Sequence, residues 1–131
     1  MSPYDFAKVA SEFGFKGLEY VNGLYPDVMN SEDKTTAIQA FVEKNNALAK
    51  QYNVKNVLIM IDGEGDLSSS EEQERMTAIE NHKLWIDAAH QMGCTAVRLN
   101  LHGEKEEGKW IKNSIESLSA LSEYAAPFNI N

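Results

Sequence analysis

The sequence predicts an α/β domain in which helices alternate with parallel strands, and two observations lead to that prediction. Strand-like apolar runs occur in "KGLEYV", "VKNVLIMID" and "CTAVRLNLH", with helical patterns before, between and after them. The stretches "FGFKGLEYV", "YNVKNVLIMI" and "MGCTAVRLNL" also form a loose repeat that joins a helix end to a strand. Strands that alternate with helices form parallel sheets with right-handed crossovers.

Four helices are expected around these strands. The first begins after Ser2, which is a good N-cap, has Pro3 in its first turn and ends near Gly14. The other three are expected over residues 35–52, 71–92 and 109–126. We expect residues 25–34 to be a loop, the serines of "GEGDLSSS" to cap the third helix, and "FNIN" to begin a further strand.

Composition excludes several classes of function. The chain has 131 residues, 43% hydrophobic residues and a net charge of -8, which suits one globular domain and disfavours nucleic-acid partners. No Lys/Arg-rich run favours binding to a membrane surface, and no apolar run is long enough to span a bilayer. Cys94 is the only cysteine, and residues 1–20 contain no signal-peptide core. We therefore expect a cytoplasmic protein.

The third predicted strand carries polar residues on one of its two faces. Alternation places Val97, Leu99 and Leu101 on one side, and Arg98, Asn100 and His102 on the other. An open doubly wound sheet and a (β/α)8 barrel both fit the order of elements, but no strand is followed by G-x-G-x-x-G and no P-loop lysine is present. A barrel accounts for the polar face, because its strands turn one side inward and carry catalytic groups at their carboxyl ends.

The two preceding strands also carry carboxylates near their ends. Glu19 lies in "GLEYV" and Asp62 follows "LIMI". Together with Arg98, Asn100 and His102 they form the candidate substrate-binding set, because buried polar groups are costly unless they are paired. The alternative is that both carboxylates only begin loops. In contrast, we expect Cys94, His82, His90, Trp85 and Trp110 to be packing or surface residues, and "GEKEEGK" to be a solvated loop or, alternatively, a lid.

The chain resembles the xylose isomerase-like (β/α)8 superfamily, which includes sugar phosphate isomerases and epimerases and the AP endonuclease family 2 group. The resemblance rests on the order and spacing of these stretches: "FAKVASEFGFKGLEYV", "VLIMIDGEGDL", "ENHKLWIDAAHQMGCTAVRLNLHG" and "SLSALSEYAAPFNI". A full barrel needs about 250 residues. The resemblance therefore implies a partial TIM barrel over residues 1–131, roughly the first half, which lacks the first strand and the C-terminal half.

The resemblance also implies an activity. Family members act on sugars or sugar phosphates, with a divalent metal (Mg, Mn or Zn) as Lewis acid and a carboxylate that moves a proton. "LNLHG" is similar to a zinc-binding strand of endonuclease IV, which makes His102 a candidate metal ligand, although the proline found there between histidine and glycine is missing here. Isomerase, epimerase, dehydratase and lyase remain open, and no catalytic residue is assigned.

Two readings of the chain therefore stand. In the first it is part of a sugar or sugar-phosphate isomerase or epimerase, inactive in isolation. In the second it is a non-catalytic half-barrel or binding module. In either case the partner is a small sugar or sugar phosphate rather than a nucleic acid or a membrane. Free strand edges favour self-association.

Overall fold

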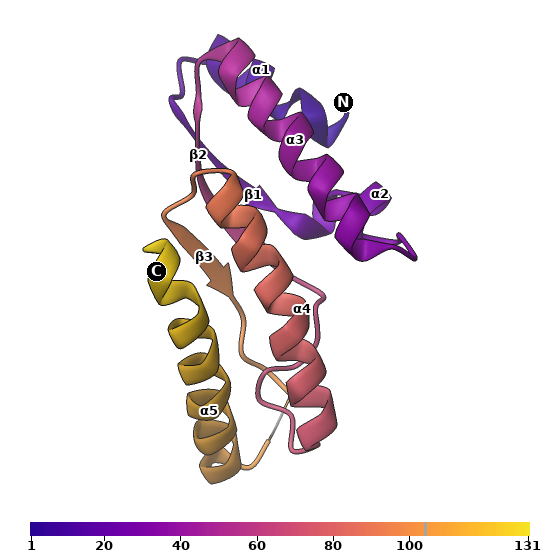
Figure 1. Ribbon diagram of the computed structural model, residues 1–131, viewed down its shortest axis with the longest axis vertical. Coiled ribbons are helices and arrows are strands. Elements are labelled where there is room, and N and C mark those ends of the chain that lie inside the picture. Colours follow the sequence, from indigo (N-terminus) through magenta and orange to yellow (C-terminus); the bar gives the residue numbers. More distant parts are fainter. Residues whose placement is uncertain (104) are drawn as a thin grey trace.

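The computed structural model describes residues 1–103 and 105–131. Three parallel strands form one sheet in the order β1, β2, β3, with bounds Gly17–Val21, Lys55–Ile61 and Ala96–Leu99. The helices are α1 (Phe6–Glu12), α2 (Pro26–Met29), α3 (Lys34–Tyr52), α4 (Glu72–Gln91) and α5 (Glu107–Ala125), and 3-10 turns flank them. The predicted alternation of helices and parallel strands is confirmed (Figure 1).

The helices form one layer beside the sheet. Each of α1, α3, α4 and α5 contacts the next, and α3 and α4 contact β2 (Figure 1). The strand order never reverses, and crossovers between parallel strands are right-handed, so successive helices fall on the same face. No described element covers the opposite face of the sheet, which we call the inner face.

The register decides which residues occupy the inner face. Glu19 pairs with Leu58, which pairs with Ala96, while Met60 pairs with Arg98. Leu18 and Tyr20, one position away from Glu19, are buried under the helices. The inner face therefore carries these residues: Glu19, Val21, Leu58, Met60, Ala96 and Arg98.

A break in register between β1 and β2 adds one more residue to the inner face. Leu18 pairs with Asn56 but Glu19 pairs with Leu58, so Val57 is an extra residue on β2. A Cβ atom on Gly17 would lie 2.9 Å from the Cγ2 atom of Val57. Glycine at this position therefore allows the two strands to approach each other.

Asn131 pairs with β3 as a residue of a fourth strand would. The Asn131 N–H donates to the Thr95 carbonyl at 3.0 Å, and its carbonyl accepts from the Val97 N–H at 2.9 Å. This is the hydrogen-bond pattern of a parallel neighbour on the outer edge of β3. It agrees with the expected start of a strand in "FNIN", although Ala126–Phe128 first form a 3-10 turn.

Three local expectations are wrong. Residues 26–29 form the short helix α2 instead of a loop, with Pro26 in its first turn. The N-cap of α4 is Glu71 rather than a serine, although the Ser69 hydroxyl accepts the Glu71 N–H at 3.1 Å. Strand β3 ends at Leu99, because Ile61 is the last residue of β2 that pairs with it.

Aromatic side chains form the centre of the core between the sheet and the helices. Trp85 and Phe41 are both fully buried, and their rings meet edge to face with centroids 5.5 Å apart. Phe41 also meets Tyr25 at 4.7 Å and Tyr20 at 6.0 Å, again edge to face. Such pairs add about 1 kcal/mol each beyond the burial of their area. This cluster joins α3 and α4 to β1.

A buried carboxylate connects the loop after β2 to the helices. The Glu64 side chain is 4% exposed, and its Oε1 accepts the Trp85 Nε1–H at 2.7 Å and lies 3.1 Å from the Lys34 ammonium. A buried charge is tolerated only when it is paired and hydrogen-bonded. The neighbouring His82 is also buried, and burial lowers its pKa, so this imidazole is neutral and donates to the Ala78 carbonyl.

We expect Trp85→Phe to destabilise the protein by about 3 kcal/mol, because it creates a cavity and removes one of two partners of the buried Glu64 carboxylate. Urea unfolding followed by far-UV circular dichroism measures this loss as a lower midpoint with an unchanged slope. Trp110→Phe is the matched control, since Trp110 is half-buried on α5. Equal losses in the two variants would contradict the role assigned to Trp85.

Candidate functional site

Three polar residues directly follow the three strands. Asn22 follows β1, Asp62 follows β2 and Asn100 follows β3. The carboxyl ends of parallel strands meet at one edge of the sheet, so these residues share one rim. Asp62 lies two positions after Met60, and Asn100 two positions after Arg98, so alternation directs both toward the inner face.

Asn22 holds the backbone of Asp62 in place. Its amide Nδ2–H donates to the Asp62 carbonyl at 2.9 Å, and its Oδ1 accepts the Asp62 N–H at 2.7 Å. The Asn22 side chain is fully buried, so both bonds form away from water. They connect the end of β1 to the end of β2 beyond the last backbone pair. Asp62 therefore starts from a fixed main-chain position.

Asn100 orients the Asp62 carboxylate. The Asn100 Nδ2–H donates to Asp62 Oδ1 at 2.8 Å, across the ends of β2 and β3. Asp62 is half-buried and Asn100 is exposed, so the pair faces solvent at the rim. The carboxylate has a second oxygen, and the Asn100 amide oxygen is a further hydrogen-bond acceptor. This arrangement suits the recognition of hydroxyl groups, which donate to such acceptors.

Opposite charges lie on the inner face below this pair. Glu19 on β1 and Arg98 on β3 are both exposed, and neither forms an ion pair within residues 1–103 and 105–131. Neighbouring strands are about 4.8 Å apart. The backbones at Glu19 and Arg98 are therefore separated by the whole width of β2. A ligand over β2 can meet both a carboxylate and a guanidinium.

His102 does not extend the alternation of β3, contrary to expectation, because the strand ends at Leu99. Its carbonyl accepts a hydrogen bond from the Ser68 hydroxyl, while its side chain is exposed. Ser68 is in turn fully buried, and its backbone N–H donates to Asp66 Oδ1 at 2.9 Å. The structure thus anchors the main chain at His102 in the loop between β3 and α5.

The described residues do not form a metal centre. Within residues 1–103 and 105–131, no three His, Cys, Asp or Glu side chains lie close enough together to hold an ion. The candidate set Glu19, Asp62 and His102 is accordingly not assembled around one point. Among the five predicted substrate contacts, the only direct side-chain bond in the described part of the chain joins Asp62 and Asn100.

Sequence reasoning missed two residues that shape this rim. Asn22 directly follows β1, as Asp62 and Asn100 follow their strands, so the same rule would have found it. Glu64 gave no signal, because its partners Lys34 and Trp85 are 30 and 21 residues away along the chain. Only the packing of α3 and α4 shows that this carboxylate is buried.

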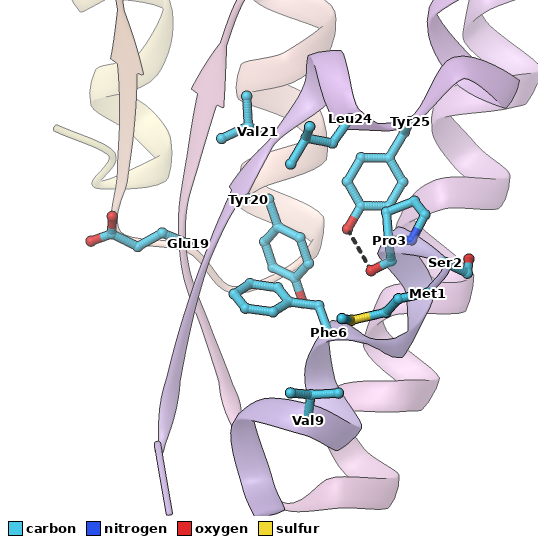
Figure 2. A pocket seen from close by; sticks show the side chains of 10 residues that line it. All are labelled: Met1, Ser2, Pro3, Phe6, Val9, Glu19, Tyr20, Val21, Leu24 and Tyr25. Atoms are coloured by element: carbon cyan, nitrogen blue, oxygen red, sulfur yellow. Dashed lines mark hydrogen bonds between the residues drawn. The ribbon is translucent and has the colours of Figure 1, made fainter. Parts of the chain in front are cut away.

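An apolar cavity of about 420 Å³ follows the free edge of β1 (Figure 2). It lies between the strand and the N-terminal segment, and Phe6, Val9, Tyr20 and Leu24 are among the side chains that line it. Glu19 leaves the strand on the side away from Tyr20 and Phe6. Burial raises the pKa of the lining residue Tyr25 to about 12, so its hydroxyl stays protonated. The side chains that line this cavity are mainly apolar and aromatic.

The remaining titratable candidates have packing roles, as expected. Burial raises the pKa of Cys94 to about 11, which leaves too little thiolate for a nucleophile. His90 stacks on Phe128 with ring centroids 4.4 Å apart.

In the described part of the chain, no helix is both long enough and apolar enough to cross a membrane.

Comparison with solved structures identifies the fold. The chain superposes on D-psicose 3-epimerase from Clostridium cellulolyticum H10 with a TM-score of 0.74 at 14% identity, covering 99% of this chain and 45% of that one. For 3-keto-D-glucoside 4-epimerase from E. coli the TM-score is 0.72 at 15% identity, and the match covers 98% of this chain and 49% of that one. For an AP endonuclease family 2 protein from Brucella melitensis the TM-score is 0.70 at 19% identity, and the match covers 98% of this chain and 47% of that one.

These likenesses concern the fold, and the chain spans less than half the length of each of these proteins. No curated protein matches the sequence. A family model described as the xylose isomerase-like TIM barrel matches residues 7–131, which is nearly the whole chain. The parallel strands in chain order, the one-sided helix layer and this match agree, and the chain belongs to the xylose isomerase-like TIM-barrel family.

Proposed function

We propose that this chain, a partial TIM barrel, forms the sugar-binding part of a carbohydrate isomerase or epimerase. The observation that carries the proposal is the Asp62–Asn100 pair, held at 2.8 Å on the rim where barrel enzymes bind their substrates. The solved neighbours that are sugar epimerases support the class of substrate. We propose Glu19, Asp62, Arg98, Asn100 and His102 as the residues that contact the sugar.

Each of these residues has a chemical role in the proposal. Asp62 accepts hydrogen bonds from one or two sugar hydroxyls, and Asn100 keeps the carboxylate in the orientation that this requires. Glu19, on the edge strand β1, accepts a hydrogen bond from a further sugar hydroxyl. Arg98 binds an anionic group such as a sugar phosphate, for which its planar guanidinium is well suited. None of the five is assigned the proton transfer itself.

The family implies a divalent metal, and the described residues of this chain do not by themselves fit one. We propose that a metal bound by the intact protein would take His102 as at most one of its ligands. The chain could alternatively act as a non-catalytic half-barrel or binding module. The unassembled ligand set favours that second candidate, because the polarising group would have to be supplied from elsewhere.

Substrate turnover separates the two candidates. The intact protein is incubated with D-fructose or D-tagatose in deuterium oxide, and proton exchange next to the carbonyl is followed by NMR. Exchange or a new epimer supports an isomerase or epimerase. Chemical-shift changes at Asp62 and Asn100 without any exchange support the binding module. The absence of both exchange and chemical-shift changes would contradict the proposed function.

We expect Asp62→Ala to weaken binding of D-tagatose at least about tenfold, because it removes charge-assisted hydrogen bonds worth about 1.5–3 kcal/mol. Two-dimensional NMR titration measures the affinity. Glu32→Ala is the matched control, since it removes an exposed carboxylate from the loop before α3. Equal affinities for the wild type and Asp62→Ala would remove Asp62 from the site.

Arg98→Gln is expected to weaken binding of fructose 6-phosphate about tenfold while leaving the affinity for unphosphorylated fructose within twofold. The reason is that guanidinium pairs with phosphate contribute charge as well as geometry. Competition titrations with both sugars measure the ratio directly. A variant that lowers both affinities equally would assign Arg98 to a hydroxyl contact instead of a phosphate contact.

The 131-residue chain is expected to bind Mn²⁺ only weakly, with a dissociation constant above about 100 µM, because few ligands converge. Isothermal titration calorimetry at pH 7.5 measures this. His102→Ala should lower even that weak affinity if the imidazole is one of the ligands. A single site of micromolar affinity would show that Glu19, Asp62 and His102 come together when the ion binds.

A further inference from the structure

Part of the loop between β2 and α4 lies in the interior of the protein, which is unusual for a loop. Leu67 and Ser68 are fully buried, and Ser69 is 8% exposed. We call residues 67–69 the buried segment. Loops usually run over the surface, because their main-chain carbonyls need hydrogen-bond donors that the interior rarely offers. The donors that allow this segment to be buried therefore show what it is attached to.

Helix α5 supplies a donor to each carbonyl of the buried segment. The Ser117 hydroxyl donates to the Leu67 carbonyl at 2.6 Å. The Asn113 amide donates to the carbonyls of Ser68 and Ser69, both at 3.1 Å. Asn113 and Ser117 are themselves buried. The segment is thus fixed to α5 by side-chain bonds that water does not reach.

The buried segment in turn holds the loop between β3 and α5. The Ser68 hydroxyl donates to the His102 carbonyl, and the Ser68 backbone N–H donates to Asp66 Oδ1 at 2.9 Å. Gly103 lies against the Asp66 carboxylate, because a Cβ atom on Gly103 would overlap it. Gly103 also has a φ of +101°, which side chains other than glycine rarely allow. Glycine therefore lets the chain at residues 102 and 103 approach Asp66 and Ser68 closely.

We propose that Ser68 and Asp66 are positioning residues that hold His102 at the sugar-binding rim, an inference that rests on the proposed function. His102 lies two residues after Asn100, whose side chain is bonded to Asp62. Two residues span at most about 7 Å of chain. A fixed main chain at His102 therefore keeps the imidazole at the same end of the sheet as the Asp62–Asn100 pair.

The bonds of Ser68 provide direction more than stability. A neutral hydrogen bond adds little net free energy to folding, because its groups bond to water in the unfolded chain. It does fix one geometry, since a buried group that loses its partner is costly. Backbone pairing within the sheet does not fix His102, because β3 ends three residues earlier, at Leu99. The Ser68 hydroxyl takes over this task where the strand no longer can.

A double-mutant cycle tests whether Ser68 acts through His102. The full 131-residue chain is titrated with D-tagatose and followed by NMR. His102→Ala should weaken binding about fivefold and Ser68→Ala about threefold, as expected when one neutral hydrogen bond is lost or loosened. Ser68→Ala/His102→Ala should bind no more weakly than His102→Ala alone. In an Asp62→Ala background, by contrast, Ser68→Ala should keep its threefold effect.

Further variants separate positioning from a general effect on folding. Asp66→Asn retains an oxygen acceptor for the Ser68 N–H and should bind D-tagatose within about twofold of the wild type, whereas Asp66→Ala should weaken binding as Ser68→Ala does. Ser119→Ala removes an exposed hydroxyl from α5 and is the matched control, with unchanged binding. In the ligand-free protein, the backbone order parameter of Gly103 should fall from about 0.85 towards 0.6 in Ser68→Ala and Asp66→Ala only.

The contrary results are distinct. Unchanged affinity and unchanged Gly103 order in Ser68→Ala would overturn the proposal. A threefold loss that persists in the His102→Ala background would do the same, because Ser68 would then act on another part of the site. Circular dichroism checks folding, and Asp66→Ala replaces Ser68→Ala in the cycle if the latter does not fold.

Failure of the proposed function gives a different pattern. A wild type that binds D-tagatose through Asp62, without coupling between Ser68 and His102, overturns the positioning role alone. A wild type that binds no sugar overturns the proposed function, and the role of His102 with it.

Discussion

The right-handed crossover between parallel strands is the constraint on which the rest of this structure depends. Because the three strands lie in chain order, every crossover places its helix on the same face. The aromatic core around Phe41 and Trp85 then forms on that face alone. The opposite face keeps its partly exposed apolar residues and two exposed charged residues, Glu19 and Arg98. One rule of backbone chirality thus separates the stabilising side of the molecule from the side that is free to interact.

Parallel strands also decide where polar groups can gather. All three strands deliver their last residues to one rim, and two buried connections hold that rim in place. Asn22 bonds to both main-chain groups of Asp62, and Glu64 connects the following loop to Lys34 and Trp85. These contacts surround Asp62 with fixed neighbours on the helix side. Its carboxylate meets Asn100 on the solvent side, where a ligand can approach.

The likeness to solved epimerases at 14–15% identity shows that the arrangement tolerates almost complete change of sequence. What is shared is the fold. Function depends instead on the few residues at the strand ends. For that reason the family supports a sugar substrate as a proposal, and the roles of Arg98 and Asp62 as sugar contacts are part of that proposal.

The amino-acid sequence by itself determined the fold class, the three strands and the helices α1, α3, α4 and α5, because hydrophobic periodicity and the Gly and Ser end signals are local. It also placed Asp62 at a strand end and put Arg98 and Asn100 on one face, since alternation is a property of neighbouring residues. It did not reveal Asn22 and Glu64 as supports of the rim, because their partners are distant in the sequence. Asp62 lies 40 residues from Asn22, and Lys34 and Trp85 lie 30 and 21 residues from Glu64. Nor did it place the end of β3 at Leu99, which depends on where the neighbouring β2 stops pairing. Tertiary structure alone decided which polar residues meet, because contact between distant segments follows from sheet register and helix packing rather than from local preference.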